Sequence, residues 1–214
     1  MAGRNEQKQR TRRALLDAAL RQLDAEKSFS SLSLREVARE AGIAPTSFYR
    51  HFSDMEELGL ALVDEGGVTL RQLMRQARKR IASSGSAIQT SLDTFLEYLS
   101  ANASLFRLLL RERSGLSRQF RAAIKAEIDH FVTELSWDLE RKANELNQPL
   151  EDPRLVAEAM VTLVFNAGAD LLDSTPAERQ AVRERLARQL RYVLRGAQQE
   201  GRRRAVTPDA PESD

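Results

Sequence analysis

Apolar residues recur at intervals of three and four along most of this chain, and clear strand patterns are absent. Such spacing predicts amphipathic helices, so we expect an all-α fold of about nine helices. Their expected ranges are about 9–26, 33–41, 45–52, 54–82, 86–101, 103–113, 117–146, 152–173 and 176–199, with a mobile arm before the first helix and a disordered tail from residue 201.

Residues 33–52 carry the strongest local signals, and these predict two helices joined by a tight turn. Ser33 and Glu36 stand three apart, as in the capping box that starts a helix. Gly42 suits the left-handed residue that ends this helix. Pro45 suits the first turn of a second helix, where its missing N–H costs nothing. The stretch therefore predicts a helix–turn–helix.

The second of these helices should turn a polar face outward. Phe48 and Phe52 are four residues apart, so both can point into the core. A short helix that is supported by another helix and presents polar side chains suits the major groove of DNA. The alternative is an ordinary surface helix. The residues expected to face outward are Thr46, Ser47, Tyr49 and Arg50.

These patterns divide the chain into three parts. Residues 1–53 would form an N-terminal three-helix DNA-binding domain that contains the helix–turn–helix. Residues 54–200 would form a larger helical domain for ligand binding and dimerisation. Residues 201–214 are rich in arginine and then in proline and acidic residues, which is typical of a disordered tail.

Composition and charge change this picture in a few respects. The net charge is only +2, yet basic residues are concentrated beside the helix–turn–helix, where DNA phosphates would lie. Cysteine is absent, so disulfide and thiol chemistry are excluded. No apolar run reaches the length of a membrane span, so we expect a cytoplasmic protein without membrane contact. The basic residues before Asp17 are Arg4, Lys8, Arg10, Arg12 and Arg13.

Motifs for catalysis or metal binding are not evident. His130 has Glu127 and Glu134 at helical spacing, but without a second histidine or a cysteine nearby an ordinary surface cluster is the expected interpretation. The chain has no Gly-x-Ser-x-Gly elbow and no glycine loop for phosphate. We therefore predict no catalytic residues, no metal and no cofactor.

The segment from Pro153 to Leu172 is apolar nearly all round in its second half, which predicts a helix buried on several sides. Its small residues 167–169 would allow another backbone to approach closely. Together with the helix expected at 176–199, it could pair with its own copy in a four-helix interface. A purely intramolecular core is the alternative. A two-fold dimer would also read two DNA half-sites.

Large apolar residues are concentrated between residues 92 and 139. They form either a simple core or a cavity for an elongated apolar ligand. Two arginines four residues apart could hold a phosphate at one end of such a ligand, or could be solvated surface residues. The candidate ligand-binding residues are Phe95, Leu99, Phe106, Arg107, Leu110, Arg111, Phe131, Leu135 and Phe165.

The stretch VAREAGIAPTSFYRHF closely resembles the DNA-binding segment of TetR-family repressors. Further stretches resemble one subgroup, the regulators of unsaturated fatty acid synthesis called FabR and DesT. These stretches are LGLALVDEGG, LRQLMRQARKRI, FRLLLRERSG and EAMVTLVFNAGA, and with weaker similarity around them the match runs from about residue 8 to about residue 195.

This resemblance implies a homodimer that binds palindromic double-stranded DNA and represses genes of fatty acid desaturation or synthesis. It implies long-chain acyl-CoA as the effector, with the saturation state of the acyl chain as the signal. Many family members have Ser or Thr where this chain has Ala44, which leaves the second helix with a weak cap. The DNA-binding residues that it implies are Arg12, Arg13, Arg35, Thr46, Ser47, Tyr49, Arg50 and His51.

Two other functions remain open at this stage. The same fold could repress an efflux operon and sense a drug-like apolar ligand. A lipid-carrying or acyl-transferring protein with an incidental basic end is the alternative from another class. Measurements of DNA binding and of acyl-CoA binding together would distinguish these two functions from the regulator of fatty acid genes.

Overall fold

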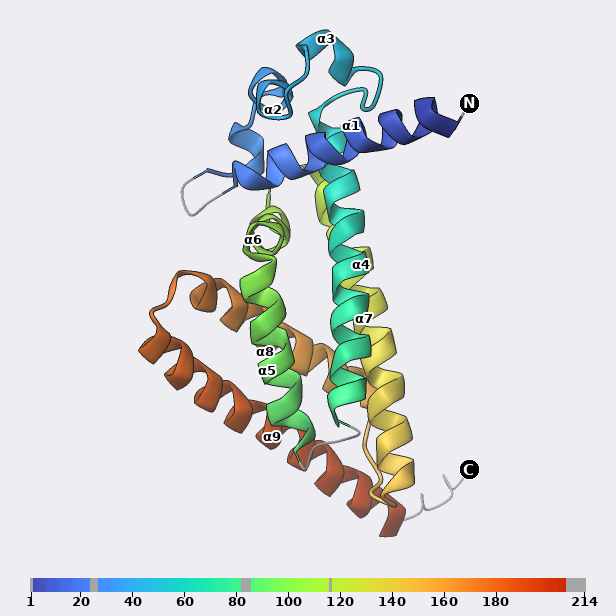
Figure 1. Cartoon of the computed structure of the whole chain (residues 1–214). Coiled ribbons are helices and arrows are strands. Elements are labelled where there is room, and N and C mark those ends of the chain that lie inside the picture. Colours follow the sequence, from blue (N-terminus) through green and yellow to red (C-terminus); the bar gives the residue numbers. More distant parts are fainter. Residues whose placement is uncertain (1, 24–26, 82–85, 116, 207–214) are drawn as a thin grey trace. The chain divides into compact units, whose positions relative to one another are not determined.

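The computed structural model describes residues 2–23, 27–81, 86–115 and 117–206, and all regular structure in these ranges is helical (Figure 1). The predicted all-α class is therefore confirmed. The elements are α1 (Ala2–Arg21), η1 (Phe29–Ser31), α2 (Leu34–Glu40), α3 (Pro45–Phe48), α4 (Met55–Ile81), α5 (Ala87–Ala101), α6 (Ala103–Glu112), α7 (Arg118–Glu145), α8 (Pro153–Asp173) and α9 (Pro176–Val206).

Most element bounds agree with the sequence prediction, and three helices differ. The expected mobile arm is wrong, because α1 is helical from Ala2, and α1 also ends at Arg21 instead of at the expected residue 26. The helix expected at 45–52 is shorter, because α3 ends at Phe48. The last helix is longer, because α9 continues to Val206. Residues 201–206 of the expected disordered tail are thus helical, and residues 207–214 lie outside the described residues.

The chain forms two compact units, and each unit is built from two separate stretches of the sequence. Unit 1 comprises residues 1–70 and 99–127, and unit 2 comprises residues 71–98 and 128–214. Helices α4, α5 and α7 each contribute residues to both units. These units are defined by packing, so the functional boundary expected at residue 53 stays a prediction.

Unit 1 is built around α1, which packs against α2 and α6, while α2 packs against α3. Its buried face is provided by Leu15, Ala18 and Ala19, none of which is exposed to solvent. The small alanines let the neighbouring helices approach closely. The Phe29 ring of η1 packs against the Phe120 ring of α7, with 5.3 Å between their centroids. The helix–turn–helix therefore shares one core with α6 and the start of α7.

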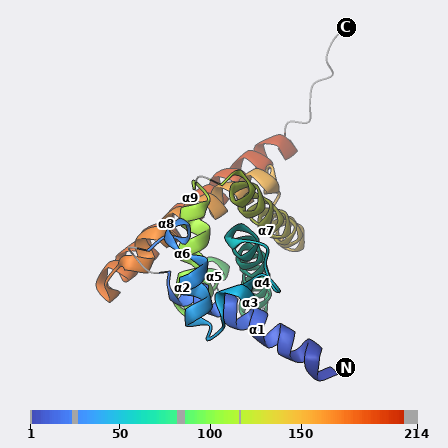
Figure 2. The same cartoon turned by 90° about the horizontal axis from the view of Figure 1, so that it is seen from above.

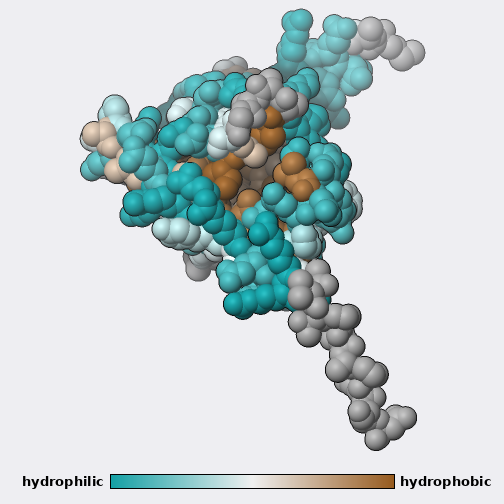
Figure 3. Space-filling view, turned by 90° about the horizontal axis from the view of Figure 1, so that it is seen from below, coloured by the Kyte–Doolittle hydropathy of each residue, from teal (hydrophilic) through white to brown (hydrophobic). Residues whose placement is uncertain are grey.

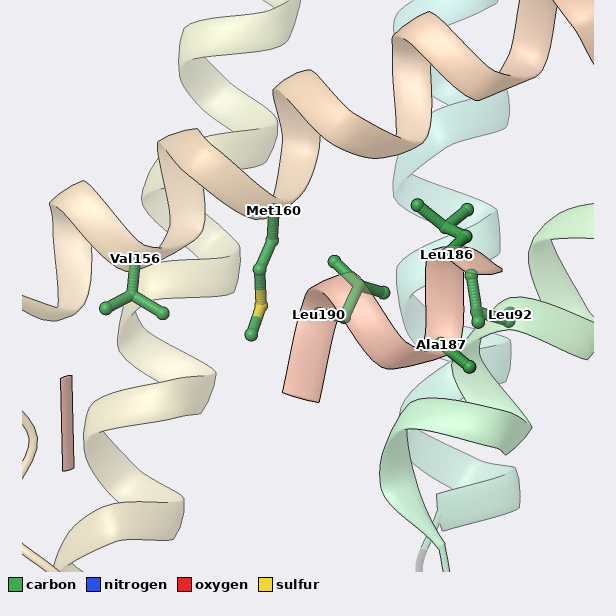
Figure 4. Close-up of a cluster of buried hydrophobic side chains, with 6 residues drawn as sticks. All are labelled: Leu92, Val156, Met160, Leu186, Ala187 and Leu190. Atoms are coloured by element: carbon green, nitrogen blue, oxygen red, sulfur yellow. The ribbon is translucent and has the colours of Figure 1, made fainter. Parts of the chain in front are cut away.

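Unit 2 has its core between α5, α8 and α9. Figure 4 shows Val156 and Met160 of α8, Leu186 and Leu190 of α9, and Leu92 of α5 gathered with Ala187 in one apolar cluster. The two helices α8 and α9 pack along each other. Among the described helices, α8 alone is long and apolar enough to cross a membrane, and much of that apolar character lies in this core.

The end of α9 is held by the turn before α8, which explains why this helix outlasts its expected end. Gly201 is buried, and a Cβ there would lie 2.7 Å from the carbonyl oxygen of Pro149. The backbone N–H of Glu151 donates to the Ala197 carbonyl at 3.1 Å. The Glu151 carboxylate also pairs with Arg204. Such contacts between distant residues fix the last turns, and sequence periodicity does not reveal them.

Candidate nucleic-acid interface

The helix–turn–helix begins with the predicted capping box. The Ser33 hydroxyl accepts a hydrogen bond from the Glu36 N–H at 3.2 Å, and the Ser33 N–H donates to the Glu36 carboxylate at 3.1 Å. The pKa of Glu36 is lowered because the Ser33 N–H and the Ser33 hydroxyl both donate to its carboxylate. After α2 the chain turns at Gly42, whose φ of 71° lies in the left-handed region. Glycine adopts this conformation at no steric cost, so the turn is set by local sequence.

The short helix α3 depends on packing rather than on capping. Its N-cap residue, Ala44, has extended backbone and makes no side-chain cap bond, and Pro45 occupies the first position. Phe48 and Phe52 are 0 % and 1 % exposed, and their ring centroids are 5.7 Å apart. Both phenylalanines thus face the core as predicted. Phe52 does so from the chain beyond α3 instead of from within the helix.

The outer side of this segment is polar and open to solvent. Tyr49, the C-cap residue of α3, is 64 % exposed, and its ring meets the Phe48 ring edge-on at 5.9 Å. Thr46 and Arg50 are exposed as well, and Ser47 is half-buried. Figure 2 shows α3 and α2 beside α1 as seen from above. The buried phenylalanine therefore fixes the ring of its outward-facing neighbour.

Two arginines of α1 that were predicted to contact DNA have different surroundings. Arg12 donates to the backbone carbonyl of His51 at 3.3 Å, and its guanidinium lies 4.2 Å from the centre of the Phe52 ring. Arg13 instead pairs with Asp17 at 2.7 Å and with Glu65 at 2.9 Å. The hydrogen bond to Asp17 is the main reason why the pKa of Arg13 is raised. Arg12 thus lies against the segment 45–52, which we call the recognition segment, and Arg13 bridges α1 to α4.

His51 lies among positive charges at the end of the recognition segment. Its Nδ1 atom is buried and has no hydrogen-bond partner within the described part of the chain. The pKa of His51 lies below its ordinary value, first because burial penalises the charged imidazole and then because Lys8, Arg12 and Arg50 are close. Lys8 belongs to the basic region noted in the sequence but was not predicted to bind DNA.

The remaining predicted DNA-binding residue, Arg35, is exposed on α2. The structure therefore brings Arg12, Arg50 and His51 together around one end of α3. Positive charge beside an exposed tyrosine and hydroxyls is the combination that phosphates and base edges recognise. The individual contacts to DNA stay predictions.

The nine candidate ligand-binding residues are divided between the two units. Leu99, Phe106, Arg107, Leu110 and Arg111 belong to unit 1, and Phe95, Phe131, Leu135 and Phe165 belong to unit 2. The phenylalanines at 95, 106 and 165 are buried, as is Leu99, whereas the other five residues are half-buried. Leu135 packs against the apolar cluster of unit 2. On the face seen in Figure 3, hydrophobic side chains gather near the centre and hydrophilic side chains surround them.

Within unit 1, α6 is joined to the helix–turn–helix by polar contacts. Arg111 donates to the Lys27 carbonyl at 3.3 Å, and the Lys27 ammonium lies 3.7 Å from the Glu36 carboxylate of the capping box. The Ser104 hydroxyl donates to the Leu23 carbonyl at 3.1 Å. Both ends of α6 thus contact residues that follow α1 and precede α2 in the chain, namely Leu23 and Lys27.

An all-helical chain with a buttressed helix–turn–helix and a basic flank has the features of a DNA-binding protein. Residues 15–62 match the family described as bacterial regulatory proteins of the tetR family, and residues 84–193 match the family described as the tetracyclin repressor-like C-terminal domain. The chain belongs to the TetR family of transcriptional regulators. Regulators of this family are soluble DNA-binding proteins, act as dimers and are not enzymes.

Solved structures show the same fold at low sequence identity. A TetR-family regulator from Mesorhizobium loti has a TM-score of 0.68 at 16% identity, covering 88% of this chain and 96% of that chain. The fatty acid degradation regulator FadR from Bacillus halodurans has a TM-score of 0.65 at 17% identity, with coverages of 83% and 94%. FadR from Bacillus subtilis, solved in complex with stearoyl-CoA, has a TM-score of 0.66 at 15% identity, with coverages of 86% and 97%.

Proposed function

We propose that this TetR-family regulator represses genes of fatty acid desaturation or synthesis and that the saturation state of long-chain acyl-CoA controls its affinity for DNA. It would act in the cytoplasm as a homodimer on palindromic double-stranded DNA. Two copies of α3 would then enter successive major grooves, which requires a separation of about 34–36 Å.

The main support for DNA binding is that the side chain of Tyr49 points outward. Its ring is open to solvent although Phe48, the preceding residue, is fully buried. A large aromatic side chain that is exposed beside hydroxyls and arginines is available for contacts to bases and phosphates. Tyr49, Thr46 and Ser47 would therefore meet the groove, while Arg12, Arg50 and His51 would meet phosphates.

Three separate observations support long-chain acyl-CoA as the effector. The stretches FRLLLRERSG and LRQLMRQAR resemble the FabR and DesT regulators. Two structures with the same fold are FadR proteins, one of them in complex with stearoyl-CoA. Finally, within unit 1 the buried residues Leu99 and Phe106 are close in the chain to Arg107 and Arg111, and this combination suits a ligand with an apolar tail and phosphate groups.

Coupling between ligand and DNA would use the contacts of α6 in unit 1. A ligand that displaced Arg111 would loosen its bond to the Lys27 carbonyl, and Lys27 lies beside the capping box of α2. A straight saturated chain and a bent unsaturated chain would displace α6 differently. Each ligand acts only through its different affinity for the two arrangements.

Binding to the duplex upstream of the protein's own gene tests the DNA-binding part. In fluorescence anisotropy at low salt we expect tight binding that weakens steeply as salt rises. The Tyr49→Ala variant should bind weakly, while Trp137→Ala, which removes an exposed aromatic residue of α7, should bind like the wild type. Wild-type protein that fails to bind at low salt would favour a lipid-carrying protein.

Isothermal titration with palmitoyl-CoA and with oleoyl-CoA tests the effector. Heat from both ligands that is unchanged in Tyr49→Ala supports separate DNA and ligand sites. Tight DNA binding without heat from either ligand would favour the alternative, a repressor of an efflux operon that senses a drug-like apolar molecule.

A further inference from the structure

The first two turns of α1 extend beyond the helices that α1 packs against (Figures 1 and 2). Residues 3–10 are all exposed, whereas Leu15 and Leu16 further along the same helix are buried. The helix therefore continues into solvent as an extension of its packed part. Once a helix is nucleated, each further residue adds one hydrogen bond, so such an extension needs no partner.

Charge is divided between two faces of this extension. Successive residues of an α-helix are turned by about 100°, so residues four apart lie on one face. Arg4, Lys8 and Arg12 follow each other at this spacing and form a stripe of three cations. We call this stripe the basic ridge.

The opposite face of the helix carries both signs of charge. Glu6, Arg10, Arg13 and Asp17 all lie there, and Arg13 pairs with Asp17 at 2.7 Å. The only acidic residue before Asp17 is Glu6, which points away from the basic ridge by helical geometry. Positive charge is thus unbalanced on one face alone.

The basic ridge leads directly to the recognition segment. Arg12, its last member, donates to the His51 carbonyl at 3.3 Å and lies over the Phe52 ring. Lys8, the middle member, is close enough for its charge to act on the His51 imidazole. Arg4 continues the line away from α3 and is exposed. The ridge and the recognition segment thus form one continuous cationic surface within unit 1.

We propose that Arg4 and Lys8 bind backbone phosphates of the DNA duplex beside the base pairs that α3 contacts, with the helical extension of α1 acting as a rigid support. This proposal rests on the DNA binding proposed above and adds two contact residues to it. Neighbouring cations of the ridge are about 6 Å apart along the helix axis, and one DNA strand carries a phosphate about every 3.4 Å of its axis. Every second phosphate of one strand recurs at nearly the spacing of the cations, so successive members of the ridge can each meet one.

The salt dependence of DNA binding measures this interaction. Log affinity falls linearly with log salt concentration, and each phosphate that the protein neutralises adds about 0.9 to the magnitude of this slope. The double variant Arg4→Gln/Lys8→Gln would leave two phosphates per protomer without a cation, and a dimer doubles this effect. We therefore expect the magnitude of the slope to be smaller by about 3 to 4 in this variant. Arg10→Gln is the matched control, because it removes an exposed arginine from the opposite face of the same helix.

A second variant tests whether the helix itself is needed. Proline in a helix interior removes a hydrogen bond and clashes with the carbonyl four residues earlier. Gln7→Pro should therefore displace Arg4 without changing any charge, and we expect a slope between those of the wild type and the double variant. A slope equal to the wild type would show that a flexible basic arm is sufficient and would overturn the rigid support.

The outcomes separate this inference from the function on which it rests. If the wild type does not bind its upstream duplex, the proposed DNA binding fails. If the wild type binds, and the double variant and Arg10→Gln both keep its slope, the ridge interaction alone is overturned. The slope could also become shallower by the same amount per removed charge in the double variant and in Arg10→Gln. This result would show unspecific electrostatic attraction and would overturn the ridge interaction as well. Circular dichroism verifies that all variants are folded.

Discussion

The Arg12 guanidinium lies 4.2 Å from the centre of the Phe52 ring and also donates to the His51 carbonyl. One side chain of α1 thus holds the chain that follows α3 through a cation–π contact and a hydrogen bond. Lysine would keep the charge but lacks the guanidinium group that makes both contacts at once.

From this relationship we predict that Arg12→Lys is destabilising. A cation–π contact of this kind is worth about 0.5–2 kcal/mol, so thermal unfolding should occur a few degrees lower. The salt slope of DNA binding should change little, because the positive charge remains. Arg10→Lys serves as the control, and equal melting temperatures for the two variants would contradict the packing role of Arg12.

Two neighbouring aromatic residues should separate stability from DNA binding. Phe48→Ala removes a fully buried ring, and we expect a loss of about 3–5 kcal/mol in the free energy of unfolding. Tyr49→Ala removes an exposed ring, so its stability should stay within about 0.5 kcal/mol of the wild type. Denaturant unfolding measures both. A large loss of stability in Tyr49→Ala would show that this tyrosine is structural.

The N-cap of α3 offers a stabilising substitution. Ala44 has the extended backbone of an N-cap residue but makes no side-chain bond to the helix. Ala44→Ser would supply a hydroxyl acceptor for a free N–H of the first turn and should add about 0.5–1 kcal/mol. The same change at Ala41, the C-cap of α2, is the control and should give no gain. A melting temperature for Ala44→Ser at or below that of the wild type would contradict this explanation.

The depressed pKa of His51 predicts pH effects of opposite sign on stability and on DNA binding. The folded protein binds fewer protons at His51 than the unfolded chain does, so stability should fall as pH drops below about 6.5. A DNA phosphate would favour the charged imidazole beside Lys8, Arg12 and Arg50. DNA affinity should therefore rise over the same fall in pH, provided that the protein remains folded.

His51→Gln removes the titrating group and should flatten both pH profiles below about pH 6.5, the ordinary pKa of histidine, because the pKa of His51 in the folded protein lies lower still. Exposed His130, in α7, provides the control variant His130→Gln, which removes a histidine outside the helix–turn–helix. Profiles for His51→Gln that match the wild type would assign the pH dependence to other groups.

The sequence was most informative where structure depends on neighbours in the chain. The bond between Ser33 and Glu36 spans three residues, and the turn at Gly42 requires a single residue type. The four-residue spacing of Phe48 and Phe52 similarly predicted that both are buried. These features need only local geometry, so their residue types indicate them directly.

Features that depend on contacts between distant residues were missed. The last turns of α9 are held because Gly201 meets the Pro149 carbonyl, and no periodic pattern reveals that contact. The start of α1 lacks apolar residues, yet it continues a helix that is anchored at Leu15. The position of Lys8 near His51 likewise follows from how α1 packs, which is a tertiary property.

The central claim is that acyl-CoA controls the affinity of this regulator for DNA, and one measurement tests it most directly. The dissociation constant for the upstream duplex is measured at fixed salt with no ligand, with palmitoyl-CoA and with oleoyl-CoA. We predict that the saturated and unsaturated ligands give dissociation constants that differ by about fivefold or more, which is the lower end of typical coupling between sites. Tight DNA binding with the same dissociation constant under all three conditions would contradict the claim.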